Sequence, residues 1–183
     1  MRYYHCFCAT LCFIAVVSCS QSKSAEIAPT DLQIIEAGSG WYKASTLRGG
    51  FQAVFPGKPT ATTDAVDSPA GRVDSYAVLV EPSGTVAFGV MYHSSPRAAP
   101  ATILQTVCSA AIRNAKVVSE RAIVLAGVAG REVIMKKLAG QALVTLRVYI
   151  FDGRVYYVSV VVPVKEPFKE HTSQFLDSFE ILK

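Results

Sequence analysis

Charged and catalytic residue types are scarce in this chain. Only 17% of its 183 residues are charged, and it contains three histidines and a single tryptophan. Lys and Arg number 18 against 14 for Asp and Glu, and this small excess is spread along the chain without a basic run. Nucleic-acid-binding proteins gather basic residues in patches, so the composition argues against that class of partner. Hydrophobic residues make up 51%, which excludes a disordered chain and fits one globular domain.

Sequence motifs that carry catalysis or bind phosphate are also missing. There is no Gly-x-Ser-x-Gly, and no glycine-rich loop leads into Lys-Ser or Lys-Thr. The scattered His, Cys and acidic residues lack the helix or hairpin spacing that a metal site needs. We therefore expect no cofactor and no metal. His93, which precedes Ser94 and Ser95 at the end of a predicted strand, is the one candidate base for an enzyme.

The five cysteines do not form a disulfide framework. Four lie within the first 19 residues, so Cys108 is the single cysteine in the rest of the chain. Residues 6–17 are apolar apart from Thr10, and this run is shorter than the about 20 residues that a membrane-spanning helix needs. Its length is typical of the apolar region of a secretory signal. We expect Cys108 to be buried, since export leads to an oxidising compartment.

The end of the apolar run carries a more specific signal. Val16-Val17-Ser18-Cys19 resembles the bacterial lipobox, which implies cleavage before Cys19 and a lipid on its thiol. Several acyl chains anchor a protein firmly to a membrane. Ser20 follows the cysteine, and a residue other than Asp there fits sorting to the outer membrane in a host with two membranes. The alternative is an ordinary signal peptide that is cut after Ser18 or Ser20.

These signals divide the chain into three parts. We expect residues 1–18 to be a lipoprotein signal peptide and residues 19–40 to hold the lipidated cysteine and a flexible tether, because residues 20–29 are small and polar. Residues 41–183 should form a single α+β domain. Thr30 and Gln33 have the spacing of a capping box, which favours a short helix over residues 30–37. The apolar residues in that segment are equally compatible with an extended conformation.

From Trp41 onward the sequence alternates with the period of two that is typical of β-strands. The strand at 85–93 is apolar on both faces, so we expect it to be central. Helical spacing appears twice, and Asp152-Gly153 predicts a two-residue type I′ hairpin turn. The predicted strands are 51–55, 60–65, 73–80, 85–93, 116–124, 131–138, 143–151 and 154–162; the predicted helices are 100–114 and 166–178; residues 127–130 are a predicted turn and 179–182 a short extended tail.

The hairpin turn sets the register of its strands, so that opposing residue numbers sum to 305. One face of the hairpin is then almost entirely apolar and should carry helices. The other face holds Arg147, Tyr149, Arg154 and Tyr156. One interpretation is a shallow aromatic and cationic surface that binds a ligand or partner. The other, which amphipathic sheets favour, is a half-covered face on which arginine stems lie over tyrosine rings.

Four segments resemble a large group of bacterial exported proteins whose domains are PsbP-like. They are residues 50–59 (GFQAVFPGKP), 68–71 (SPAG), 125–133 (LAGVAGREV) and 175–179 (FLDSF), and the resemblance extends over residues 46–183. Ala129 stands where the group tends to have proline. The resemblance implies an antiparallel β-sheet with helices packed on it, as a PsbP-like αβα sandwich, and it favours a binding or accessory module over an enzyme.

Three functions are compatible with these features. The first is an envelope lipoprotein, anchored to the membrane through Cys19, that acts as a non-catalytic binding or accessory module for an envelope protein or a small ligand. The alternative is a small envelope enzyme, or an accessory subunit that completes a partner's active site, with His93 as its base. The third is a structural spacer between envelope layers.

Overall fold

The computed structural model describes residues 31–68, 71–95, 98–165 and 169–182. The predicted signal peptide and the predicted lipidation of Cys19 lie outside these residues. No helix in the described ranges is long and apolar enough to cross a membrane.

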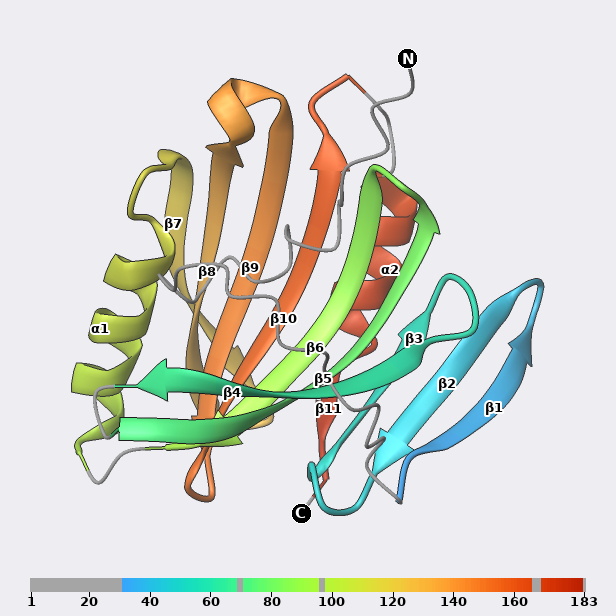
Figure 1. The fold of residues 1–183 in the computed structure, drawn as a ribbon, viewed down its shortest axis with the longest axis horizontal. Coiled ribbons are helices and arrows are strands. Elements are labelled where there is room, and N and C mark those ends of the chain that lie inside the picture. The colour runs from blue at the N-terminus through green and yellow to red at the C-terminus, as the bar shows by residue number, and fades with distance from the viewer. Residues whose placement is uncertain (1–30, 69–70, 96–97, 166–168, 183) are drawn as a thin grey trace.

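Strands dominate the structure, and helices flank them (Figure 1). The strands are β1 (Gln33–Gly38), β2 (Trp41–Thr46), β3 (Phe51–Phe55), β4 (Thr60–Ser68), β5 (Gly71–Ser83), β6 (Val86–Ser94), β7 (Lys116–Leu125), β8 (Val128–Lys137), β9 (Ala142–Phe151), β10 (Arg154–Pro163) and β11 (Glu180–Ile181). The helices are α1 (Pro100–Ala111) and α2 (Lys169–Asp177), with a 3-10 turn η2 (Leu138–Gly140).

These strands form two antiparallel sheets. The large sheet has seven, in the order β4-β5-β6-β10-β9-β8-β7, and the small sheet has four, in the order β1-β2-β3-β11. Strand β6 lies inside the large sheet and pairs with β10. The two strands are far apart along the chain, and the segment between them contains α1. The prediction that residues 85–93 form a central strand is confirmed. Nearly all residues of this strand are buried, which is why its sequence is apolar on both faces.

The two faces of the large sheet are covered differently. Helix α1 packs on one face, where Ile103, Leu104 and Cys108 meet the apolar residues of β8, β9 and β10. The small sheet and α2 cover the other face, where Phe51, Phe175 and other aromatic side chains form the second core. The expected antiparallel sheet with helices on it is confirmed, but the αβα sandwich needs correction. The protein is richer in strand, because a second sheet occupies most of one face.

The β9–β10 hairpin has the register that its turn predicts. Val155 faces Ile150 and Tyr156 faces Tyr149, and Asp152 and Gly153 both have positive φ, at 47° and 68°. These angles are those of a type I′ turn, whose twist matches that of the flanking strands. Alternate residues of the hairpin therefore enter the two cores as the summed numbering requires.

Two local predictions need correction. For residues 30–37 the helical alternative is wrong and the extended alternative is confirmed, because the segment contains β1, whose pairing with β2 outweighs the capping signal although most of β1 is exposed. The folded part thus begins before residue 41, within the span expected to be a tether. The turn predicted at residues 127–130 is shorter: Ala126 and Gly127 form it, with φ of 48° and 85°, and β8 starts at Val128.

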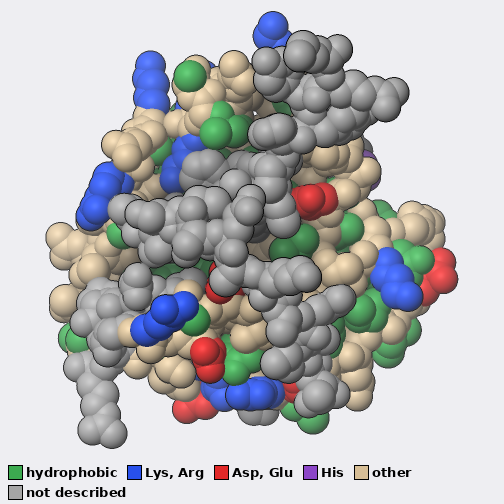
Figure 2. Space-filling model, in the orientation of Figure 1, with side chains coloured by type: hydrophobic (Ala, Val, Ile, Leu, Met, Phe, Trp, Pro, Cys, Tyr) green, Lys and Arg blue, Asp and Glu red, His purple; other side chains and the backbone are tan. Residues whose placement is uncertain are grey.

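The connections between strands lie at two opposite ends of the domain. The β2–β3 connection and the β9–β10 turn lie at the lower end of Figure 1, and the β8–β9 connection with η2 lies at the upper end. A hydrogen bond ties the β2–β3 connection to β10, since the Tyr156 hydroxyl donates to the Gly49 carbonyl at 2.9 Å. Figure 2 shows Lys and Arg side chains at separate places on one face of the molecule, which fits the dispersed basic residues of the sequence.

Gly130 supplies a test of how closely the second core is packed. A Cβ atom added at Gly130 would lie 2.5 Å from Tyr149 Cδ1 and 2.7 Å from the Val148 carbonyl oxygen. We expect Gly130→Ala to lower the free energy of unfolding by about 1–3 kcal/mol, because a buried ring and backbone must move. Urea unfolding followed by circular dichroism measures the loss. Gly84→Ala is the matched control, since its Cβ would meet nothing within 4 Å; equal stabilities of the two variants would contradict the packing.

Candidate functional site

The four residues of the predicted binding surface lie on one face of the β9–β10 hairpin, where Tyr149 and Tyr156 are cross-strand partners and the two arginines lie at separate places on either side of them. Arg147 and Tyr149 lie near the end of α2 and the start of β11. Arg154 and Tyr156 lie next to the β2–β3 connection, where Tyr156 contacts Gly49. The four side chains therefore do not form one continuous site.

The two tyrosines are inside the protein. Tyr149 stacks on Phe179 with ring centroids 5.8 Å apart and an interplanar angle of 16°. Tyr156 packs against Phe179 at 5.9 Å and edge-on against Phe51 at 6.5 Å. Burial raises the pKa of both phenols, so they stay neutral. The small sheet and α2 cover this face. The structure therefore agrees with the half-covered interpretation, and the cover is more complete than that interpretation expected. The two rings have almost no exposed surface to offer a ligand.

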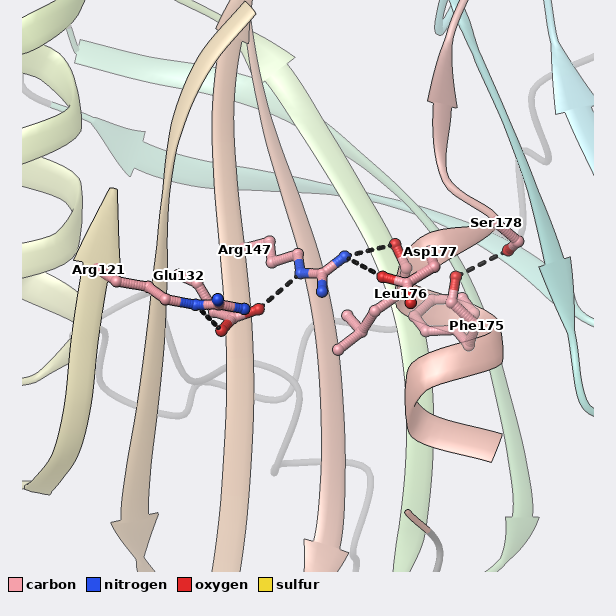
Figure 3. A network of polar contacts seen from close by, with 7 residues as sticks. All are labelled: Arg121, Glu132, Arg147, Phe175, Leu176, Asp177 and Ser178. Atoms are coloured by element: carbon pink, nitrogen blue, oxygen red, sulfur yellow. Dashed lines mark hydrogen bonds and ion pairs between the residues drawn. The ribbon is translucent and has the colours of Figure 1, made fainter. Parts of the chain in front are cut away.

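Arg147 belongs to a row of charges that crosses three strands and reaches α2 (Figure 3). Its Nε donates to Glu132 Oε2 at 2.8 Å, and one terminal nitrogen donates to Asp177 Oδ1 at 2.8 Å and to the Leu176 carbonyl at 2.9 Å. Arg121 Nε donates to the other oxygen of Glu132 at 2.7 Å. We call Arg121, Glu132, Arg147 and Asp177 the Glu132 network.

Glu132 is the buried centre of this network. Burial alone would raise its pKa, but the hydrogen bonds from Arg121 and Arg147 outweigh burial and hold the pKa below its ordinary value. The same pairing raises the pKa of Arg147 despite burial of the guanidinium. Both oxygens of the carboxylate are thus satisfied by charged donors, which is what a buried charge requires.

Sequence reasoning missed most of this network. Arg131 and Glu132 are adjacent in the sequence, but neighbouring residues of a strand point to opposite faces, and Arg131 pairs instead with Glu120 at 2.8 Å. The Ala126-Gly127 turn places Arg121 directly opposite Glu132, so a correct prediction of this turn would have revealed the Arg121–Glu132 contact. Glu132 in turn faces Arg147 on β9.

A second polar group surrounds the β2–β3 connection, and no sequence pattern had indicated it. Asp31 Oδ2 accepts hydrogen bonds from the Arg48 backbone N–H at 2.6 Å and from the Thr46 hydroxyl at 2.9 Å. Burial would raise the pKa of Asp31, but these hydrogen bonds outweigh it and lower the pKa. The Arg48 guanidinium lies 4.9 Å from the centre of the Tyr76 ring and donates to its hydroxyl at 2.9 Å.

Tyr76 in turn stacks on Tyr92, with ring centroids 5.2 Å apart. We call Asp31, Thr46, Arg48, Tyr76 and Tyr92 the Arg48 cluster. Within the described ranges, Asp31 Oδ1 and the Tyr92 hydroxyl are buried without a hydrogen-bond partner in the protein. Ordered water or a bound polar group satisfies buried atoms of this kind. Arg154, a residue of the predicted surface, borders the cluster and pairs with Asp152 at 3.1 Å.

His93, the candidate base, is buried at the end of β6. Its Nδ1 is 2.8 Å from the Ser94 carbonyl oxygen, and its Nε2 is 2.9 Å from the Tyr157 hydroxyl. Burial lowers the pKa of the imidazole and raises that of Tyr157, so both groups are neutral. The ring is therefore a hydrogen-bonded core residue that a substrate cannot reach in this conformation.

Cys108 is buried on α1, as expected, and is a free thiol. Burial raises its pKa to about 11. A thiol with such a pKa is almost entirely protonated at neutral pH and is a poor nucleophile. His93, the one candidate base, and Cys108 thus both lie in the core.

The chain is similar to known proteins in its fold and not in its sequence. No protein-family model matches it, and no curated protein does. Among solved structures it is similar to cyanobacterial PsbP (CyanoP) from Synechocystis sp. PCC 6803, with a TM-score of 0.55, 14% identity, and coverage of 91% of this chain and 98% of that one. The fold is PsbP-like.

A second structure is similar at a lower level. It is LpqN of Mycobacterium tuberculosis, described as involved in cell envelope biogenesis, with a TM-score of 0.43, 12% identity, and coverage of 88% of this chain and 87% of that one. At these identities the PsbP-like fold is what the comparisons establish, and a fold hosts many functions.

The Glu132 network predicts a specific dependence of stability on pH. The pKa of Glu132 in the folded state lies below its ordinary value of 4.5. Its contribution is therefore complete above that pH and is lost as the pH falls through the folded-state pKa. We expect Glu132→Gln to lower the free energy of unfolding at pH 7 by about 2 kcal/mol, because the amide points an N–H₂ donor at a guanidinium and leaves Arg147 without its buried charge partner.

Urea unfolding at several pH values checks this prediction. Asp177→Asn is the matched control: its carboxylate is 66% exposed, so we expect a loss of less than about 1 kcal/mol. Wild-type stability should fall more steeply between pH 5 and 3 than that of Glu132→Gln, with the range set by the carboxyl pKa. Parallel pH profiles and equal stabilities would show that the buried ion pair contributes nothing.

Proposed function

We propose that this protein is an exported lipoprotein whose PsbP-like domain acts as a non-catalytic binding or accessory module. The observation that carries the proposal is the sequence of residues 16–19, which matches the lipobox and directly follows an apolar run of signal-peptide length. Lipid on Cys19 would hold the domain at a membrane, with the outer membrane favoured by Ser20.

The state of His93 and Cys108 supports a non-catalytic role. The alternative of a small enzyme requires His93 to take up a proton from a substrate or a bound water. Both of its ring nitrogens lie within hydrogen-bond distance of protein oxygens, and burial disfavours the charged form. Cys108 is protonated and enclosed under α1. Catalysis at either residue would need a large rearrangement of the core.

The Glu132 network is the surface that we assign to a protein partner. Its two ends are exposed, Arg121 by 64% and Asp177 by 66%, while Glu132 and Arg147 between them are mostly buried. The buried pair holds opposite exposed charges in place on β7 and α2. Charges positioned in advance favour the encounter with, and orientation of, a complementary partner. A small ligand is the other class of occupant for an accessory module.

The lipid anchor can be tested in cells that express the full chain. Metabolic labelling with an alkyne fatty acid should mark the wild-type protein, and the protein should fractionate with membranes. Cys19→Ser should lose the label and leave the membrane fraction, because no thiol remains at the cleavage site. Cys108→Ser is the matched control and should keep the label, since Cys108 is buried. An unlabelled wild-type protein, or a labelled Cys19→Ser variant, would contradict lipid attachment at this cysteine.

The binding role can be tested by cross-linking in the same cells. We expect a specific envelope protein to co-purify with the wild type, and Arg121→Gln to reduce its yield several-fold, because the variant removes an exposed charge but keeps a donor for Glu132. Lys116→Gln is the matched control: it removes the same charge from the exposed first residue of β7, outside the Glu132 network. Equal yields from the two variants would remove the Glu132 network from the interface. If no partner is found, a metabolite screen on the domain tests the small-ligand version.

A further inference from the structure

The chain enters its folded part at one end of the domain. Asp31 is hydrogen-bonded to Thr46 and to the backbone N–H of Arg48, so it lies at the base of the β2–β3 connection. Cys19 precedes Asp31 by 12 residues, which span at most about 40 Å. Strand β9, with 10 residues, places the β8–β9 connection about 30 Å from the β9–β10 turn. A lipid on Cys19 therefore attaches the domain through its β2–β3 end, but this reach exceeds the length of the domain, so a preferred orientation needs a contact of the β2–β3 end itself with the lipid.

This end presents an apolar side chain to solvent. Leu47 is 80% exposed, the largest exposed fraction among the large hydrophobic side chains that are described. The connection that carries it is held by hydrogen bonds from Gly50 N–H to the carbonyls of Thr46 and Leu47 and from Gly49 N–H to the Thr46 hydroxyl. Leu47 is thus a fixed apolar tip, and insertion into the surface of a bilayer would remove its side chain from water.

A cation and an aromatic ring lie directly beside this tip. The Arg48 guanidinium is exposed, and it lies over Tyr76 and is hydrogen-bonded to the hydroxyl of that ring. Tyrosine is enriched at membrane–water interfaces, and arginine is attracted to anionic headgroups. Arg154 adjoins the same connection but is paired with Asp152, so Arg48 is the main cation of this end. An apolar tip flanked by arginine and tyrosine has the chemistry of an interfacial contact.

We infer that the β2–β3 connection docks on the lipid surface, with Leu47 among the acyl-chain ends and Arg48 at the phosphate groups of anionic lipids. The inference rests on the proposed anchoring at Cys19 and adds an orientation to it. The domain then stands on the membrane with η2 and the β8–β9 connection farthest from the lipid. In that orientation the Glu132 network lies on the side of the domain, between the two ends, where a partner in the envelope can reach it.

The orientation can be measured without relying on lipidation in cells. The chain from Cys19 onward contains every described residue, and Cys108 is buried, so a maleimide lipid in vesicles couples at Cys19. In a Trp41→Phe background, Leu47→Trp reports on the near end. Leu138→Trp is the matched control, since Leu138 is 41% exposed in η2 at the far end. Vesicles of phosphatidylcholine and phosphatidylglycerol, with and without brominated acyl chains, provide the quencher.

We expect brominated lipid to quench Leu47→Trp at least about twofold more than Leu138→Trp, because the quenching requires contact with the acyl chains. Adding Arg48→Gln should reduce the quenching of Leu47→Trp in anionic vesicles and leave it unchanged in pure phosphatidylcholine. Equal quenching at the two positions, or stronger quenching of Leu138→Trp, would overturn the inference. Quenching of Leu47→Trp that is insensitive to Arg48→Gln would overturn the role of the cation.

The two proposals fail in different experiments. If cells do not label Cys19 but the coupled domain shows strong Leu47→Trp quenching, the docking surface stands and the anchor is wrong. If cells label Cys19 but the coupled domain shows no difference between its ends, the anchor stands and the docking surface is wrong.

Discussion

The seven-stranded sheet needs cover on both faces, and the rest of the structure follows from this requirement. Its inner strands β6 and β10 are buried almost along their whole length, so neither side can face water. Helix α1 covers one face. The other is covered by the small sheet and α2, which bring segments from both ends of the described chain onto it. Phe51, from β3, and Phe179, which directly precedes β11, both pack there against Tyr156.

Covering the second face also buries polar groups, and each buried charge has been given partners. Glu132 receives two guanidinium groups, and Arg147 uses its remaining hydrogen-bonding capacity on Asp177 and on the carbonyl of Leu176 near the end of α2. Ser178 continues this attachment, since it accepts from Val54 N–H at 2.8 Å. Buried ion pairs often add little net stability, but breaking one is costly. The network therefore fixes the position of α2 over the sheet more than it strengthens the fold.

The covered face changes where a functional surface can be sought. The aromatic rings that looked available from the sequence are packing residues. The exposed groups are instead the ends of the Glu132 network and the residues around the β2–β3 connection, which lie in different parts of the molecule. This separation suits an anchored module that faces lipid with one surface and a partner with another. A PsbP-like fold alone does not specify either contact, because contacts depend on the particular side chains at each surface.

Short-range patterns in the sequence predicted several local features of the structure correctly. The Asp152-Gly153 turn is short, so two residues set the whole β9–β10 register, and the spacing of Ile103, Val107 and Ala111 was enough to place α1. The tertiary structure alone decided the rest. Residues 33–38 form a strand because β2 offers a pairing partner, although the local signal favoured a helix. Tyr149 and Tyr156 are buried because β3 and the segment that leads into β11, about 100 and 30 residues away along the chain, pack over them. Contacts between distant segments depend on how whole sheets stack, and no short-range pattern in the sequence encodes that stacking.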